Sequence, residues 1–298
     1  MNAFNITTAS HIGGREEQQD SVGHWSTSET CLVVVADGVG GRTGGRAASQ
    51  TVLRCAEEHW QQCQGVMKNP EQELTEIARL ANDAIHALTP DEKRSPASTL
   101  VALYIDQSRA HWIHVGDSRL YWLRPQKGNP PKELQRTRDH SVVQMLLEQD
   151  KITQEEVNTH PDKGRILKAL GSSSFKGVDY STQEYATGDT FLLCSDGYWE
   201  SIATGYPILP PKPPKMAMDV YATQLVSEAV KINGATESDN TTLAIVTVNR
   251  EIEPAAPASH SAESAPAKGQ TLKTLLMAML YLFIIFDIAI FIYLFILK

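Results

Sequence analysis

Apolar side chains recur with a helical period in three long segments of the chain. Residues 47–63, 71–88 and 216–232 each place their apolar side chains on one face of a helix. Short apolar runs predict strands at residues 31–36, 99–105, 110–115, 120–123, 190–194 and 242–248. Because the strands come in runs and the long helices in blocks, this order favours antiparallel sheets covered by helices over a repeating βαβ arrangement.

Two short helices and one loop complete the predicted elements of residues 1–250. Residues 141–149 and 153–157 have helical patterns, and the second begins with the capping box Thr153-Gln-Glu-Glu156. Residues 205–215 read GYPILPPKPPK and predict a loop, because prolines do not sustain a helix or a central strand. A plain surface connection and a docking segment for a partner that recognises polyproline both fit this composition.

An apolar run near the C-terminus predicts a membrane span, assigned to residues 274–297. From Leu275 to Leu297 the only charged residue is Asp287. A helix of that length would reach ~34 Å, against a hydrocarbon core of ~30 Å. One central Asp costs ~3 kcal/mol on the insertion scale, which the apolar residues outweigh. Asp287 would either pair with a polar group of another membrane helix or be pulled towards water, and the sequence leaves both open.

The segment before this run predicts a tether and an orientation. Residues 251–273 are rich in Pro, Ala and Ser without an apolar period, which indicates a disordered linker. The N-terminal residues MNAFNITTAS do not form a signal peptide. Lys268 and Lys273 precede the run and only Lys298 follows it. We therefore expect a single-pass protein of the cytoplasmic (inner) membrane with residues 1–250 in the cytoplasm.

Charge and cysteine content exclude two classes of protein. The chain has 27 basic and 35 acidic residues and a net charge of −8, which is a poor match for nucleic acid. Its four cysteines lack the C-x-x-C spacing of zinc ribbons and dithiol redox sites. The cysteines therefore read as small core residues of a reducing compartment.

Acidic residues recur at the ends of the predicted strands. A single Asp-Gly after a strand usually marks a turn. Five aspartates at such positions predict instead a site for a hard divalent cation, which prefers carboxylate and carbonyl oxygens. Gly38, beside one of them, lets a backbone carbonyl approach the same ion. The five are Asp20, Asp37, Asp117, Asp196 and Asp239.

Seven motifs, in order, carry a resemblance to a known family. They are REEQQDS (15–21), VVVADGVGGRTGGRAAS (33–49), HVGDSRLY (114–121), RDHSVV (138–143), ALG (169–171), LLCSDGYWE (192–200) and SDNTTLAIV (238–246). Over residues 5–250 the chain resembles bacterial metal-dependent Ser/Thr protein phosphatases of type 2C. The resemblance implies an α+β fold for residues 1–250. This fold is a four-layer α-β-β-α sandwich of two antiparallel sheets flanked by helices, to which the sequence adds one C-terminal transmembrane helix.

The same resemblance implies a role for each candidate residue. Two Mn²⁺ or Mg²⁺ ions, with room for a third, would take their ligands from the aspartates, and a metal-bridging hydroxide would attack the phosphate without a phosphoenzyme. Paired cations neutralise such a displacement, and arginine binds phosphate oxygens with a planar fork. In the roles that the resemblance implies, Asp37 bridges two ions, the Gly38 carbonyl binds one of them, and Asp196 and Asp239 complete the pair. Asp20 binds through water, and Asp117 shares a third ion with Asp196. Arg15 holds the phosphate.

Three residues depart from the family pattern. Gln18 stands where Asn is usual, and Arg46 where many members have Glu. Val39 occupies the place of a histidine proposed as general acid in some eukaryotic members, and valine has no proton to give. Residues 141–168 correspond to a mobile flap, for which substrate selection and a plain surface role are both open. We expect a structural hydrogen-bonding role for His140, which directly precedes that segment.

These features predict a protein-serine/threonine phosphatase that hydrolyses phosphoserine and phosphothreonine. Its expected substrates are a bacterial Ser/Thr kinase or the membrane-associated proteins that the kinase phosphorylates, in a secretion or envelope system. The alternative is a catalytically weak pseudophosphatase that binds phosphoproteins as a scaffold. Retention of Arg15 and all five aspartates favours the enzyme, and the acidic charge disfavours a metal-dependent nuclease.

Overall fold

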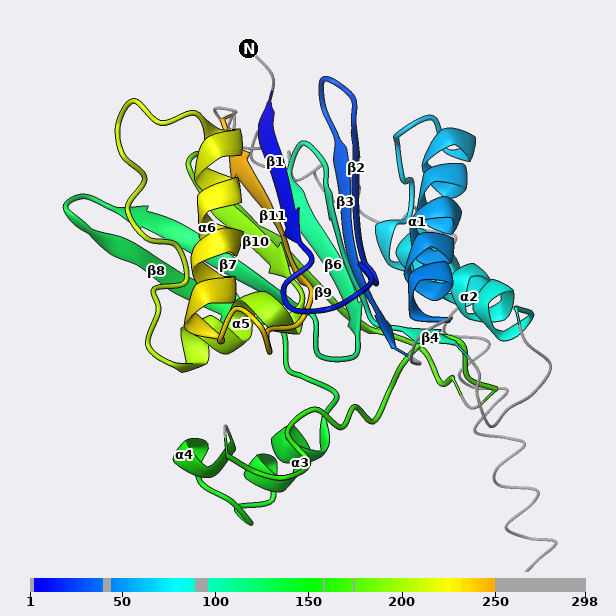
Figure 1. Ribbon diagram of the computed structural model, residues 1–298. Coiled ribbons are helices and arrows are strands. Elements are labelled where there is room, and N and C mark those ends of the chain that lie inside the picture. Colours follow the sequence, from blue (N-terminus) through cyan, green and yellow to red (C-terminus); the bar gives the residue numbers. More distant parts are fainter. Residues whose placement is uncertain (1–2, 40–43, 89–95, 158, 174, 250–298) are drawn as a thin grey trace, which may run out of the picture. The chain divides into compact units, whose positions relative to one another are not determined.

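Two antiparallel sheets form the centre of the structure, which is a computed structural model describing residues 3–39, 44–88, 96–157, 159–173 and 175–249 (Figure 1). The first sheet has the order β1 (Phe4–His11), β11 (Thr241–Val248), β10 (Thr190–Cys194), β7 (Arg119–Gln126) and β8 (Asn129–Arg136). The second has the order β2 (Asp20–Ser26), β3 (Cys31–Val39), β5 (Leu100–Ile105), β6 (Arg109–Val115) and β9 (Asp179–Glu184), and β4 (Ala97–Ser98) pairs with β3.

Helices cover the outer face of each sheet. α1 (Gly45–Gln62) and α2 (Pro70–His86) pack on the second sheet, and α5 (Asp196–Ala203) and α6 (Met218–Ile232) pack on the first (Figure 1). Each helix buries an apolar stripe, such as Leu74, Ile77 and Ala81 of α2, against the strands beneath it. The predicted arrangement of two antiparallel sheets flanked by helices is thus confirmed.

Strand β3 shows why the central strands are apolar without interruption. Val33 and Val35 point between the two sheets, where they meet Trp112 and Phe191. The alternate side chains of β3 point outward and pack under α1 and α2. Because both faces of this strand are buried, neither face needs polar residues.

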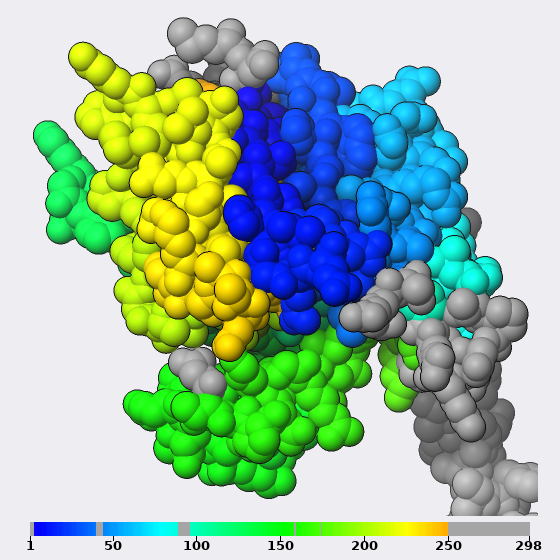
Figure 2. All heavy atoms as spheres, viewed as in Figure 1, coloured from blue at the N-terminus to red at the C-terminus, as the bar shows by residue number. Residues whose placement is uncertain are grey.

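A flap, defined as residues 141–168, projects from the body between β8 and β9 (Figures 1 and 2). It carries α3 (Val142–Glu148) and α4 (Gln154–Val157). The predicted capping box is present, because the Thr153 N–H donates to Glu156 Oε2 at 2.7 Å and the Glu156 N–H donates to Thr153 Oγ1 at 3.4 Å. The flap also contacts α5 through an ion pair of 3.2 Å between Lys163 and Glu200.

Residues 205–215 form the predicted loop, and the loop is tied to the helices below it. The hydroxyls of Tyr198 and Tyr221 donate to the carbonyls of Ile208 and Pro210. Lys212 Nζ donates to the Met216 carbonyl at 2.7 Å. These contacts give the loop a packing role, and its recognition by a partner stays a prediction.

The structure tests the prediction made for the four cysteines. Cys31, Cys55 and Cys194 are buried and Cys63 is partly buried, all as free thiols, which confirms them as packing residues.

No helix within the described ranges is long and apolar enough to cross a membrane. The chain divides after Ile252. The predicted linker at 251–273 and span at 274–297 lie outside the described residues, so both stay predictions.

Candidate metal centre

The candidate aspartates come from both sheets and meet at one end of them. Asp37, near the end of β3, pairs in register with Asp20 on β2. Asp117 lies in the turn from β6 to β7, and Asp239 lies two residues before the start of β11. Asp196 is the first residue of α5, just after β10. The fold therefore gathers residues that are up to about 220 positions apart in the sequence.

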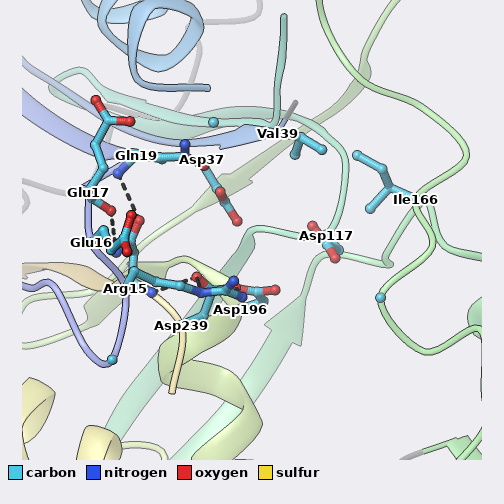
Figure 3. A pocket seen from close by; sticks show the side chains of 14 residues that line it. Arg15, Glu16, Glu17, Gln19, Asp37, Val39, Asp117, Ile166, Asp196 and Asp239 are labelled. Carbon is cyan, nitrogen blue, oxygen red and sulfur yellow. Dashed lines mark hydrogen bonds and ion pairs between the residues drawn. The ribbon is translucent and has the colours of Figure 1, made fainter. Parts of the chain in front are cut away.

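These side chains line an acidic cleft of about 610 Å³. Four of the five aspartates face it, and Asp20 lies next to them across the β2–β3 pair. Figure 3 shows Asp37, Asp117, Asp196 and Asp239 around a common space, with Val39 and Ile166 on one side and Arg15 on the other. The predicted site residues in the cleft wall are Arg15, Asp37, Gly38, Asp117, Asp196 and Asp239.

Two carboxylate oxygens in this group are buried without a hydrogen-bond donor. They are Asp20 Oδ1 and Asp196 Oδ1, within the part of the chain that the structure describes. The other oxygen of Asp20 accepts a hydrogen bond of 2.7 Å from Ser195 Oγ. A buried polar atom without a partner is unfavourable unless another group compensates it. Hard divalent cations bind such oxygens, so the donor set fits Mg²⁺ or Mn²⁺.

The aspartates also raise one another's affinity for protons. Burial raises the pKa of Asp20 to about 7 and that of Asp117 to about 7. Loss of hydration, reinforced by Asp20 and Asp196, raises the pKa of Asp37 well above its ordinary value. Asp196 has its pKa raised well above the ordinary value in the same way, with Asp117 as the largest charged neighbour. Such a group of like charges calls for positive charge within the cleft.

Arg15 lies at the mouth of the cleft and is paired with one of the candidate ligands. Its Nε and Nη2 donate to Asp239 Oδ1 and Oδ2 at 2.9 and 2.6 Å. The hydrogen bonds and charge of Asp239 raise the pKa of the guanidinium. The Arg15 side chain keeps 56% of its surface exposed, so a phosphate entering the cleft can reach it.

Polar residues that the sequence did not single out hold this centre in place. Thr99 Oγ1 accepts the Asp37 N–H at 2.9 Å, and Ser195 Oγ donates to Asp20. The Asn240 side chain accepts the Gln19 N–H at 2.7 Å and donates to the carbonyls of Ile12 and Glu17, which fixes the segment that carries Arg15. The available signal was their position beside predicted strand ends, which alone does not separate supporting residues from turn residues.

The structure shows where each of the three residues that depart from the family pattern lies and what it contacts. Gln18 accepts the Asp20 N–H at 3.0 Å and donates to Ser10 Oγ at 2.7 Å, so its longer side chain still supports the site. Arg46 approaches Glu17 with a separation of 3.9 Å between charged atoms. Val39 lines the cleft as an apolar side chain.

A second group able to hold a metal ion is present beside this centre. The donor atoms of His114, His140 and Asp179 lie within 4.8 Å of one another. His140 Nδ1 accepts the Gly116 N–H at 3.1 Å and its Nε2 lies 3.2 Å from Asp179, while Lys168 Nζ donates to Asp179 at 3.1 Å. These contacts place His140 in a hydrogen-bonded cluster at the base of the flap, as expected from the sequence.

Comparisons with known proteins show which proteins this chain is similar to. The family model for protein phosphatase 2C matches residues 7–231. Protein phosphatase PhpP of Streptococcus pneumoniae is 31% identical over 241 residues, which cover 80% of this chain and 94% of that protein. The PstP catalytic domain, in a structure with two manganese ions, matches with a TM-score of 0.65 and 25% identity over 83% of this chain and 99% of its own. PppA, described as a key regulatory component of the T6SS in Pseudomonas aeruginosa, matches with a TM-score of 0.60 and 25% identity over 83% of this chain and 98% of its own.

Proposed function

Because the chain belongs to the protein phosphatase 2C family and is a protein serine/threonine phosphatase, we propose that its aspartate cluster holds the divalent cations needed for hydrolysis of phosphoserine and phosphothreonine. The observation that carries the proposal is the pair of buried, donor-free carboxylate oxygens on Asp20 and Asp196. Asp37, Asp196 and Asp239 would hold two Mg²⁺ or Mn²⁺ ions, together with the Gly38 carbonyl. Asp20 would support them through water, and Asp117 with Asp196 would provide for a third ion.

The cations, when bound, supply charge neutralisation and activation of water for an in-line displacement. The chain's own residues supply the rest. Arg15 binds the phosphate oxygens of the substrate, in exchange for part of its pairing with Asp239. Val39, at the cleft wall, gives no proton to the departing serine or threonine oxygen, so that proton comes from water.

The test of the cation requirement is turnover of a phosphothreonine peptide by the full-length protein. We expect activity with Mn²⁺ or Mg²⁺, loss of activity in excess EDTA, and recovery when the cation is returned. Circular dichroism in EDTA serves as the control that the fold persists. Undiminished turnover in excess EDTA by folded protein would refute the proposed role of the cluster.

The proposed location is the cytoplasmic membrane, with residues 274–297 as a single-pass anchor and residues 251–273 as a tether. The support is the apolar run and the Pro/Ala/Ser-rich composition before it. A tether raises the local concentration of the enzyme near substrates on the same membrane, so the proposed substrates are a Ser/Thr kinase or proteins that it phosphorylates there. The likeness to PppA fits a substrate in a secretion system.

Removal of residues 271–298 tests this location. We expect the shortened protein to leave the membrane fraction and its substrates to stay more phosphorylated in cells, with turnover of a soluble phosphopeptide unchanged. Unchanged fractionation would contradict the proposed anchor, and unchanged substrate phosphorylation would contradict the proposed membrane-bound substrates.

A further inference from the structure

Helix α5 contains one of the candidate aspartates and donates a hydrogen bond to the main chain of another. Asp196 is its first residue, and Trp199 follows one turn later on the same face. The indole Nε1–H of Trp199 donates to the main-chain carbonyl of Asp117 at 2.9 Å. The helix therefore provides one carboxylate directly and holds the backbone of another.

The face of the Trp199 indole stacks on an arginine that belongs to a buried ion pair. The Arg119 guanidinium carbon lies 3.6 Å from the centroid of the Trp199 ring. Arg119 in turn donates from Nε and Nη2 to Asp139 at 2.8 and 2.7 Å. The Arg119 and Asp139 side chains keep only 12% and 7% of their surfaces exposed. A bidentate, enclosed pair of this kind fixes the plane of the guanidinium, and with it the indole stacked on that plane.

The hydrogen bond from Trp199 goes to the turn between β6 and β7, whose conformation is held by further hydrogen bonds. Gly116, directly before Asp117, has a φ of 100°, a conformation that favours glycine. Gly116 exchanges two hydrogen bonds with His140, at 3.1 Å to Nδ1 and at 2.8 Å from the His140 N–H. The turn is thus held on one side by His140 and on the other side by Trp199.

We propose that Trp199 is a positioning residue, whose indole N–H, supported by Arg119 and Asp139, fixes the main chain of Asp117 and so sets the affinity of the centre for its divalent cations. This inference rests on the proposed function of the aspartate cluster. Residues that orient metal ligands typically change metal affinity by ~10- to 100-fold when they are altered. Trp199 acts through the backbone of one ligand only, so we expect an effect of ~10-fold, at the lower end of that range.

The chain offers a matched control in Trp122. Its indole also donates a hydrogen bond to a buried partner, Asp189 Oδ2 at 3.0 Å, and it also lies beside an arginine, with Arg124 Cζ 5.7 Å from the ring centroid. Neither tryptophan lines the cleft, but Trp122 belongs to β7 and its partner Asp189 is not one of the candidate aspartates. Replacing either tryptophan by phenylalanine keeps an aromatic ring and removes one N–H donor.

The experiment compares Trp199→Phe with Trp122→Phe in the full-length protein. Binding of Mn²⁺ alone is measured by the electron paramagnetic resonance signal of the free ion, and turnover of a phosphothreonine peptide is measured against Mn²⁺ concentration. We expect Trp199→Phe to weaken one class of Mn²⁺ sites by ~10-fold and to shift the Mn²⁺ dependence equally, with the KM for the peptide within twofold of wild type. We expect Trp122→Phe to match the wild type in Mn²⁺ binding.

A second variant guards against a folding defect in the first. Arg119→Lys keeps the positive charge but loses the planar fork and the stacking, so it should weaken Mn²⁺ binding in the same direction. Wild-type Mn²⁺ affinity in folded Trp199→Phe, or equal losses in both tryptophan variants, would overturn the inference alone. Absence of Mn²⁺ binding by the wild type would overturn the proposed function together with it.

Discussion

Asp189 and Asp20 are both buried carboxylates, yet their surroundings are opposite. Asp189 is fully buried and receives hydrogen bonds from Trp122, from Arg124 through two nitrogens, and from the Ala186 N–H. Asp20 is 6% exposed, and one of its oxygens has no donor. Asp20 is the first residue of β2 and Asp189 directly precedes β10, so both belong to the same sandwich and burial alone does not mark a functional site.

The difference lies in where the compensating charge comes from. The protein itself supplies Asp189 with a cation and enough donors, which gives a closed structural contact. Around Asp20 the protein supplies further carboxylates instead, and the proposed divalent cations would supply the positive charge that this cluster lacks. Substitutions at the two kinds of aspartate should therefore act on different properties of the enzyme.

The largest expected effect is at Asp37. Asp37→Asn should lower turnover on the order of 10³-fold, because it removes the proposed bridging ligand and several kcal/mol of charge stabilisation. The same change should raise the stability of the metal-free protein by about 1–3 kcal/mol, since it removes a poorly compensated carboxylate. Turnover with Mn²⁺ and urea unfolding in EDTA measure the two effects, and a metal-free protein destabilised by the change would contradict this account.

Asp189 should respond in the opposite sense. Asp189→Asn should destabilise the protein by about 3 kcal/mol, because it leaves the Arg124 charge and the surrounding donors without their acceptor. Turnover per folded molecule should stay near that of the wild type. The check is urea unfolding together with activity normalised to the folded fraction, and a large loss of kcat in fully folded protein would show that Asp189 also supports catalysis.

The stability of the metal-free protein should depend on pH through the aspartate cluster. Asp20 and Asp117 have pKa values of about 7 in the folded protein, above the value of ~3.9 in an unfolded chain. The folded state then binds more protons than the unfolded state between pH ~4 and ~7, so their stabilising contribution is lost as pH rises through that range. We expect the melting temperature in EDTA to be lower by about 5 °C at pH 7.5 than at pH 5. Mn²⁺ should remove most of this difference, and an EDTA profile that rises with pH would refute the sign.

Prediction of the fold from sequence succeeded for the interior of each sheet and failed at the edges. The central strands β3, β5 and β10 were predicted because burial on both faces demands continuous apolar runs. All four edge strands were missed. Edge strands pair on one side only and tolerate polar residues, as in DYSTQE of β9 and NPPKELQR of β8. The short α5 was missed because Ser-Asp-Gly after β10 also suits a turn.

The acidic residues of the site could be predicted from the sequence, whereas the residues that hold them in place could not. Hard cations leave a recognisable chemistry in the sequence, which is aspartate beside glycine at strand ends. Thr99, Ser195 and Trp199 support the site through single hydrogen bonds whose partners are set by tertiary contact. A single threonine, serine or tryptophan has many equally good structural roles, so no local pattern identified them.

The smallest expected effect concerns Arg15, and α2 provides its control. Arg15 forms a bidentate pair with Asp239, and Arg79 forms one with Glu76 and a further contact of 2.7 Å with Asp83. Both arginines are at the surface. Arg15→Lys keeps the charge but loses the fork, so it should raise the KM for a phosphothreonine peptide by ~10-fold and leave stability nearly unchanged, since exposed ion pairs contribute little. Arg79→Lys should change neither property. Equal behaviour of the two variants in peptide kinetics would mean that the Arg15 fork takes no part in phosphate binding, and the positive charge of the cleft would then have to come from the cations alone.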